Sequence, residues 1–228
     1  MSRTVRHTEK HLFALTPAAV IVGVVLLAMS PQAAEAARGS RGGAPSSRKG
    51  GEIWIEVPRY ALPAGDAYVG QYALEYQPPE GLGFGFGIMF GIADKVGVEG
   101  RLVQSNHSVL TTGDHWDLDQ AFIFLRYMFI GEGRAQPFVG AGYVHHSMEW
   151  DPGDDEFGDF TRLAGHGWGV SAGVDYFYSS RITVTLRADY AHAGYSRRFV
   201  GVAEETFPEP IDGSTFGASI AIGYRVPL

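Results

Sequence analysis

Apolar residues alternate with small or polar residues along most of the chain. From Leu82 to Ile92 every even position is Leu, Phe or Ile, and every odd position except Met89 is Gly. A period of two places these sets on opposite faces of a β-strand. Seven other segments alternate in this way: Tyr68–Tyr76, Val96–Leu102, Asp117–Phe129, Pro137–Trp150, Gly167–Tyr178, Ile182–His192 and Thr215–Val226. The pattern predicts an all-β chain with eight strands.

The composition of the less apolar face separates two all-β architectures. A soluble β-sandwich shows polar residues to water and buries its apolar face. Here the less apolar face is mostly Gly, Ser and Ala with a few charges, which suits the narrow interior of a barrel whose apolar outside faces lipid. Twelve glycines are predicted to face this interior: 83, 85, 87, 91, 97, 140, 142, 167, 169, 173, 217 and 223. We therefore favour an antiparallel up-and-down transmembrane β-barrel over a sandwich, with the aromatic residues outside.

Connection lengths predict the orientation of this barrel. Short links at 93–95, 130–135 and 179–181 alternate with long ones at 105–116, 151–165 and 196–214. Outer-membrane barrels have short periplasmic turns and long extracellular loops. One outer link, 77–81, is short. Glu52–Val57 also alternates, and it could extend the first strand, cap the periplasmic mouth, or be the true first strand with a link through Pro58–Gly65.

The first 36 residues have the order of a secretory signal peptide. Three basic residues precede an apolar run from Leu12 to Met29, and the small-residue sequence AEA ends at Ala36. An uncleaved anchor is the alternative, but the run is borderline in length for a spanning helix and contains Pro17. We predict a cleaved signal peptide over 1–36, a Gly, Ser and Arg-rich flexible leader over 37–51, and the barrel over 52–228.

Composition excludes several classes of function. The 228 residues include 31 Gly, 4 Trp, 11 Tyr and 14 Phe, no Cys, and a formal net charge of −7. Without Cys there is no disulfide scaffold and no thiolate metal or redox site. The acidic balance argues against a nucleic-acid partner. We expect no cofactor.

Charged residues on the predicted inner face indicate a filled lumen. Buried charges have to be paired, and the planar guanidinium of Arg suits carboxylates. Eight strands leave room for little more than side chains. An ion-pair network that fills the lumen is therefore favoured over a narrow gated pore. The predicted members are Glu75, Glu99, Asp175, Asp189, Arg101, Arg126, Arg187 and Arg225.

Three polar residues at alternate positions share one face of a strand that would end near the outer leaflet. His145, Ser147 and Glu149 are the residue types of an activated nucleophile. The blander interpretation is a polar belt at the membrane boundary. Aromatic residues near strand ends are likewise predicted to form a girdle there. The predicted girdle residues are Trp54, Trp116, Trp150, Trp168, Tyr68, Tyr76, Tyr127, Tyr143, Tyr176 and Tyr178.

The segment from Asp151 to Asp159 is the densest acidic run of the chain. Carboxylate oxygens there could bind Ca²⁺, although their spacing does not match an EF-hand. A solvated surface loop is the favoured interpretation. The candidate ligands are Asp151, Asp154, Asp155, Glu156 and Asp159.

Several of these segments resemble a known family. GLGFGFGIMFGIADKVGVEGR, PFVGAGY, GVSAGVDYFYSSRITVTLRADY and GASIAIGYRV, in this order, resemble small eight-stranded outer-membrane proteins of the OmpA/OmpX and opacity type over residues 66–228. The resemblance implies an outer-membrane location and a barrel that anchors variable binding loops. It also implies three partners: outer-membrane lipid and lipopolysaccharide, the barrel-insertion machinery, and an extracellular ligand of unknown identity. One departure is the final Leu228, where the family usually has an aromatic residue.

The expected function is therefore a non-enzymatic structural anchor whose extracellular loops serve adhesion or other surface interactions. The first alternative is a lipid A deacylase-like hydrolase, because some eight-stranded outer-membrane proteins of that activity carry a His-x-Ser pair. Their motif, His-Ile-Ser-Asn, lies late in the chain, and the comparable stretch here, YAHAGYS, has Gly194 where Ser is needed. A narrow porin is the third possibility.

Overall fold

The computed structural model describes residues 50–61, 68–69, 72–73, 81–108, 115–129, 134–151, 161–200 and 203–227. The predicted signal peptide and the predicted leader up to residue 49 lie outside this part of the chain. Within it, no helix has the length and apolar character that a membrane-spanning helix needs.

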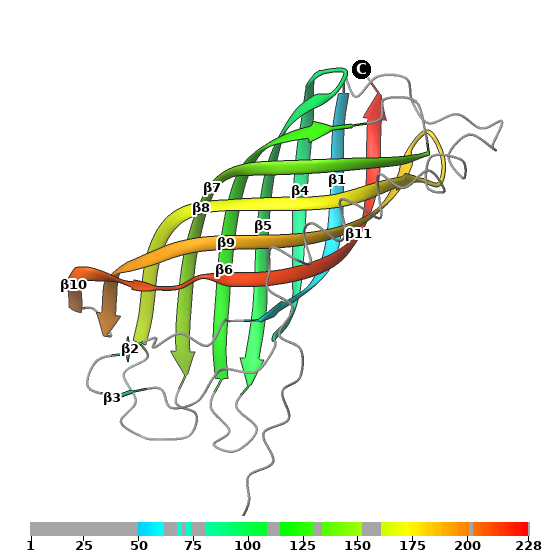
Figure 1. Ribbon diagram of the computed structural model, residues 1–228. Helices are drawn as coiled ribbons and strands as arrows, with labels where there is room; N and C mark the ends of the chain where they lie inside the picture. The colour runs from blue at the N-terminus through cyan, green and yellow to red at the C-terminus, as the bar shows by residue number, and fades with distance from the viewer. Residues whose placement is uncertain are drawn as a thin grey trace, which may run out of the picture.

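Eight long antiparallel strands close into a barrel (Figure 1). They are β1 (Gly50–Ala61), β4 (Gly81–Ala93), β5 (Val96–Ser108), β6 (His115–Met128), β7 (Ala135–Asp151), β8 (Thr161–Phe177), β9 (Ile182–Val200) and β11 (Thr215–Pro227). Each strand pairs with the next, and β11 returns to β1 in a ladder from Gly50↔Pro227 to Ala61↔Phe216. The predicted eight-stranded antiparallel all-β barrel is confirmed.

Three further strands lie outside the barrel wall. β10 (Ala203–Asp212) pairs only with β9, and their ladder continues the sheet past the end of the barrel (Figure 1). β2 (Tyr68–Val69) and β3 (Tyr72–Ala73) pair only with each other.

The first barrel strand is β1, so the prediction of a barrel strand over Tyr68–Tyr76 is wrong. Both segments alternate, and alternation alone does not show which one finds a partner on each side. β1 pairs with β4 and with β11. The third interpretation of Glu52–Val57, the true first strand, is therefore correct. The link to β4 runs from 62 to 80, so the first outer connection is long rather than the short 77–81 that the sequence suggested. The predicted long link 105–116 is wrong in length, because β5 and β6 extend into it and leave only 109–114 between them.

The strand also begins earlier than composition suggests, because Gly50 and Gly51 belong to it rather than to the leader. Gly50 has φ of 133°, a conformation that glycine adopts without the steric cost of a Cβ.

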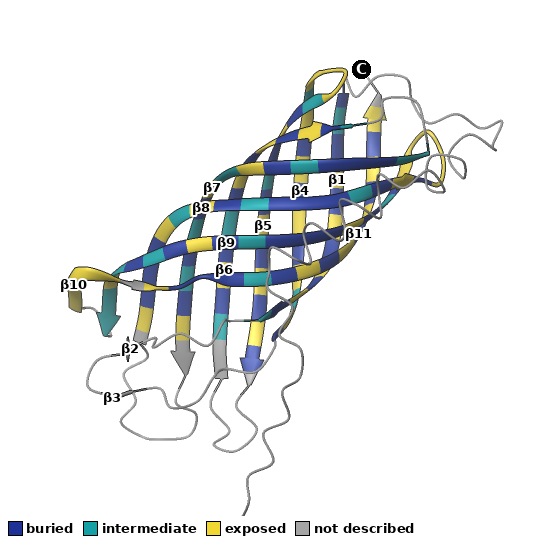
Figure 2. Ribbon diagram, viewed as in Figure 1, coloured by how far each residue is buried: buried dark blue, intermediate teal, exposed yellow. Residues whose placement is uncertain are grey.

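The barrel is apolar on its outside and polar or small on its inside. Buried and exposed residues alternate along the strands (Figure 2). Outward-facing Phe84, Leu186 and Ile222 are each 58% exposed, whereas inward-facing Arg101 and Glu99 are buried. A continuous exposed apolar belt of this kind is the surface that faces lipid in a membrane barrel.

Glycines on the inner face make room for aromatic side chains of neighbouring strands. Trp54 is in register with Gly87 on one side and Gly223 on the other. A Cβ on Gly87 would collide with the Trp54 indole, and one on Gly217 would collide with the ring of Tyr60. The expectation that aromatic residues lie outside is therefore wrong for the buried inner set, which comprises Trp54, Tyr60, Phe122, Phe124, Phe138, Phe177 and Tyr195.

Other aromatic residues do lie at the two ends of the apolar belt. Tyr127, Tyr176 and Tyr178 are exposed near the short turns, and Tyr143 and Trp168 are exposed towards the opposite end. Trp54 does not belong to this girdle, because it faces the lumen. The predicted girdle side chains of Trp116, Trp150, Tyr68 and Tyr76 lie outside the described residues.

The strand assignment is testable by replacement. Exchanging residues 66–76 for a Gly-Ser linker should leave a barrel that still shifts in gel mobility on boiling, because β1 and β4 pair without this segment. Ile55→Pro should abolish the shift, since it removes a backbone donor from a strand paired on both sides. The opposite result would restore 68–76 as the first strand.

Candidate functional site

Ion pairs join opposite walls of the barrel at its centre. β5 and β9 are separated by four strand steps in either direction around the ring. Arg101 Nη1 on β5 lies 2.9 Å from Asp189 Oδ2 on β9. Arg187 on β9 binds both oxygens of the Glu99 carboxylate on β5, at 2.8 and 3.0 Å. All four side chains are buried, so the lumen is filled at this level.

The same network continues towards the periplasmic end through Arg126. Its guanidinium lies 3.2 Å from Glu99 Oε2 and 2.6 Å from Asp175 Oδ2. The Thr185 hydroxyl donates a hydrogen bond to the other Asp175 oxygen at 2.8 Å. Six of the eight predicted lumenal residues thus contact one another. Arg225 is buried on β11, and Glu75 lies outside the described residues.

Two acidic residues of the lumen were not among those predicted. Glu56 Oε2 lies 3.5 Å from Arg101 and 3.9 Å from Arg187, and it accepts a hydrogen bond from Ser219 at 3.0 Å. Glu52, four residues before Glu56 on the same face of β1, is also buried. The alternation of EIWIEV was the available signal, but it was usable only once this segment was known to be a barrel strand.

Aromatic rings lie beneath two guanidinium groups of the network. The Arg126 guanidinium carbon is 3.4 Å from the centroid of Phe138, and that of Arg101 is 4.1 Å from the centroid of Phe122. Cation–π contacts of this kind are strengthened when water is excluded. The rings therefore hold the charged groups in place and occupy the remaining space.

A second polar cluster crosses the lumen near its extracellular mouth. The Gln120 amide on β6 donates to Thr215 Oγ1 on β11 at 3.0 Å and lies 2.8 Å from His146 Nε2. His146 Nδ1 is 3.2 Å from the carbonyl oxygen of Gly213. These contacts assign the proton to Nδ1, because Nε2 accepts. Since β6 and β11 are also opposite strands, the lumen is bridged twice.

The outer surface of β5–β9 changes from apolar to polar over three rows of residues that run across the strands. One row, in register, is Gly100, Ile123, Tyr143, Trp168 and His192. The row two residues further out is Leu102, Ala121, His145, His166 and Gly194, and the next is Gln104, Asp119, Ser147, Ala164 and Arg197. On β7 and β8 the outward side chains therefore change from aromatic at Tyr143 and Trp168 to polar at His145 and His166.

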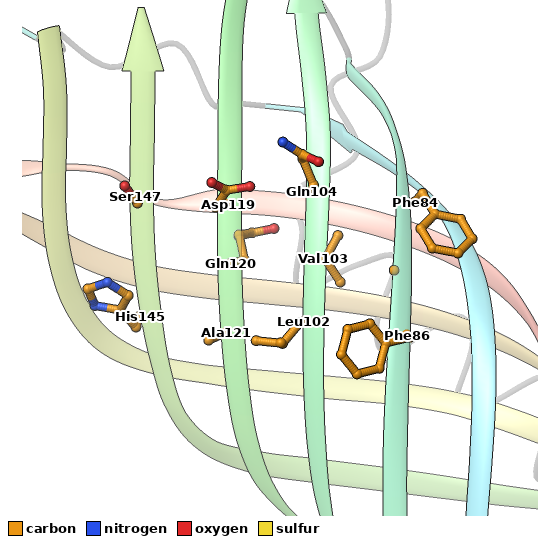
Figure 3. A pocket seen from close by; sticks show the side chains of 11 residues that line it. Phe84, Phe86, Leu102, Val103, Gln104, Asp119, Gln120, Ala121, His145 and Ser147 are labelled. Carbon is orange, nitrogen blue, oxygen red and sulfur yellow. The ribbon is translucent and has the colours of Figure 1, made fainter.

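A groove opens on the outside of β4–β7 near His145 (Figure 3). Its volume is about 450 Å³. Ala121 is small and lies between Leu102 and His145 on the adjacent strands, which leaves the hollow. The apolar lining consists of Phe84, Phe86, Leu102 and Ala121, and the polar lining of Gln104, Asp119, His145 and Ser147.

The groove contains two of the three predicted nucleophile-site residues. His145 and Ser147 line it, both half-buried, whereas Glu149 is exposed further out and does not line it. Asp119 is the carboxylate in register with Ser147. Same-face neighbours on a strand are about 6.6 Å apart, and among the described contacts no hydrogen bond links His145 with Ser147. The arrangement is a polar edge above an apolar floor, without an assembled nucleophile and base.

A Ser–His–Asp set that sequence reasoning missed lies where β10 joins β11. Asp212 Oδ1 accepts hydrogen bonds from the backbone N–H of Ser214 at 2.9 Å and from its hydroxyl at 2.6 Å. The same hydroxyl is 2.9 Å from His192 Nδ1. In a catalytic triad the serine and the carboxylate contact different ring nitrogens. Here both face Nδ1, so the set closes a turn.

The predicted calcium ligands cannot be placed. Asp154, Asp155, Glu156 and Asp159, and the side chain of Asp151, lie outside the described residues. Among the residues that the structure describes, no group of three or more His, Cys, Asp or Glu could hold a metal ion.

The lumenal network predicts an unequal response to the loss of two arginines. Arg187→Met leaves Glu99 buried beside fewer cations, so the free energy of unfolding should fall by about 3–5 kcal/mol. Arg181→Met, at an exposed turn, should change it by less than about 0.5 kcal/mol. Urea unfolding in detergent micelles measures both. Equal effects would show that the network contributes nothing to stability.

Three comparisons relate this geometry to known proteins. The family model of the outer membrane protein beta-barrel domain matches residues 19–225. No curated protein sequence matches the chain.

Solved structures share the fold at low sequence identity. The crystal structure of neisserial surface protein A is 12% identical with a TM-score of 0.53, over 78% of this chain and 98% of that one. Outer membrane protein OprG from Pseudomonas aeruginosa is 15% identical with a TM-score of 0.54, over 80% and 98%. Ail, the attachment invasion locus protein of Yersinia pestis, in complex with the heparin analogue sucrose octasulfate, is 13% identical with a TM-score of 0.51, over 78% and 99%.

The matched family model covers nearly the whole barrel. The apolar belt and the closed sheet of this barrel are those of a membrane protein. The chain belongs to the outer membrane protein beta-barrel domain family and is located in the outer membrane.

Proposed function

We propose that this barrel is a sealed anchor that displays its extracellular end for attachment to other surfaces. The observation that carries the proposal is the pair of cross-lumen contacts, Arg101–Asp189 and Glu99–Arg187, which join opposite walls. A lumen closed by buried ion pairs has no room for solute passage, so the accessible surface lies at the extracellular end and around the outer rim.

The shape of that end supports a display role. β8, β9 and β10 form a sheet that extends past the rest of the wall (Figure 1). β10 carries exposed Glu204, Glu205 and Glu209, and its second edge has no strand partner among the described residues. Charged side chains and prolines, here Pro208 and Pro210, keep such an edge soluble.

The likeness to Ail also supports an attachment role. Ail shares the fold and is by name an attachment invasion locus protein, and it was solved with a heparin analogue. Because this chain has the same fold, we infer that its extracellular end also serves attachment. The hydrolase alternative has less support, because His145 and Ser147 are not hydrogen-bonded to each other in the groove.

A sealed lumen predicts that the protein conducts no ions. The purified protein in planar lipid bilayers should show no stepwise conductance, because the network fills the barrel between β5 and β9. Arg101→Ala combined with Arg187→Ala should open a conductance by removing both cross-lumen arginines. Stepwise conductance in the parent protein would contradict the sealed-anchor proposal.

Attachment is testable on cells. A Gram-negative host expressing the protein should bind an epithelial cell monolayer or immobilised heparin more strongly than the host alone. Replacing 66–76 and 152–160 by Gly-Ser links should reduce binding to the level of the host alone. The matched control is Asp94→Asn in a short turn at the opposite end, which should leave attachment unchanged. Undiminished attachment after both loop replacements would exclude those loops as the display surface.

A further inference from the structure

Two histidines hold the turn between β10 and β11 from opposite faces of the sheet. On the lumenal side, Nδ1 of buried His146 on β7 donates a hydrogen bond to the Gly213 carbonyl at 3.2 Å. On the outer side, Nδ1 of exposed His192 on β9 lies 2.9 Å from the Ser214 hydroxyl. The same turn, 212–214, therefore contacts one ring that water reaches and one that it does not.

This turn fixes the end of β10 that lies at the barrel mouth. The Gly213 N–H donates to the Ala193 carbonyl at 2.8 Å, and a Cβ on Gly213 would collide with the Tyr195 ring. The ladder between β10 and β9 shifts register between Thr206 and Ile211, and β10 has no other strand partner among the described residues. The contacts at the turn therefore decide whether this end of β10 stays in place.

The outer contact persists when its histidine gains a proton. The Ser214 hydroxyl donates to Asp212 Oδ1 at 2.6 Å, so its oxygen accepts the hydrogen of His192 Nδ1. Protonation of Nε2 leaves this chain of donors unchanged. It also adds a positive charge 3.7 Å from Asp212 Oδ1 and beside the Trp168 ring, and both neighbours favour a cation. The His192 and Asp212 side chains are 47% and 63% exposed, so the gain is small.

The inner contact does not tolerate a proton. Neutral His146 uses both ring nitrogens, because Nδ1 donates to Gly213 and Nε2 accepts from the Gln120 amide at 2.8 Å. A proton on Nε2 would place two donors face to face. Reversal of the Gln120 amide would turn its NH₂ group towards a buried position where Oε1 has no hydrogen-bond partner among the described residues. Either arrangement leaves a buried donor unsatisfied, which is costly.

The described residues around His146 offer no carboxylate to its charged form. The neighbouring His145 on β7 is itself a cation in acid and acts on His146 unfavourably. Asp189, deeper in the lumen, is bound by Arg101 at 2.9 Å, and Asp212 is engaged within the turn. The other titratable groups that line this end of the lumen are Tyr60, His107, Tyr195 and Arg198. A cation at His146 would therefore be buried without a partner, at a cost of several kcal/mol.

We infer that the turn at 212–214 is a pH-sensitive latch that orders β10 at neutral pH and releases it in acid. At neutral pH both histidines hold the turn. In acid His146 releases the Gly213 carbonyl to reach water, whereas the chain from His192 to Asp212 keeps its donors. The turn then loses its hold on the lumenal side. The inference does not depend on the attachment proposal, because it concerns the order of β10 itself.

Hydrogen–deuterium exchange of the purified protein in detergent micelles tests the latch. After correction for the chemical exchange rate at each pH, exchange over 203–214 should be at least about tenfold faster at about pH 4.5 than at about pH 7.5, because a histidine that reaches water binds a proton below about pH 6.5. Between these limits the change should approach about tenfold per pH unit, since one proton is taken up. Exchange over 81–93 on β4 should stay slow at both pH values.

His146→Gln separates this histidine from other effects of acid. Glutamine retains one donor and one acceptor at this position but gains no proton, so exchange over 203–214 should be slow at both pH values. His166→Gln, which removes an exposed histidine from the outer face of β8, should leave the acid response intact. His192→Gln should also retain it. A gel mobility that still shifts on boiling shows that each variant is folded.

Three results would overturn the inference. The first is equal or slower exchange over 203–214 in acid in the parent protein. The second is an acid response of the same size in His146→Gln, or its loss in His192→Gln alone. The third, which needs no variant, is a dependence steeper than about tenfold per pH unit, which would assign the response to several lumenal carboxylates instead.

Discussion

Closure of the sheet is the constraint on which the rest of the structure depends. In hydrocarbon an unpaired backbone N–H or C=O costs several kcal/mol, so a membrane sheet has to leave no free edge. The ladder between β1 and β11 meets this requirement from Gly50↔Pro227 to Ala61↔Phe216. With eight strands the enclosed space is narrow, and every inward side chain must fit against those from the opposite wall.

The interior satisfies that constraint with pairs of unlike residues. Large rings lie against glycines of the neighbouring strand, as Trp54 does between Gly87 and Gly223. Carboxylates on one wall bind arginines on the other, and aromatic rings pack against the guanidinium groups. The abundance of both glycine and aromatic residues in this chain follows from this packing as well as from the apolar belt.

The outer surface has to match two surroundings, because each strand passes from lipid into water. On β7, for example, outward-facing Tyr143 is followed by His145, Ser147 and Glu149 towards the end of the strand. Asp119 and Glu149 are exposed on β6 and β7, whereas Arg197 of β9 faces Glu204 of β10, so charges of both signs gather beyond the apolar belt. The sealed interior leaves this rim and the outer connections as the surfaces at which the protein can act.

Alternation along the chain determined the class of fold, the inward or outward direction of most residues, and six lumenal charges that contact one another, because a strand's two faces follow from local geometry alone. The identity of the first strand needed the tertiary structure. Glu52–Val57 and Tyr68–Tyr76 alternate alike, and only pairing with both β4 and β11 distinguishes β1. Glu56, the His146–Gln120 bridge, and the groove on β4–β7 also depend on contacts between residues far apart in sequence. Such contacts depend on which strands close the ring and which lie opposite one another across the lumen, and the alternation within one strand does not specify this.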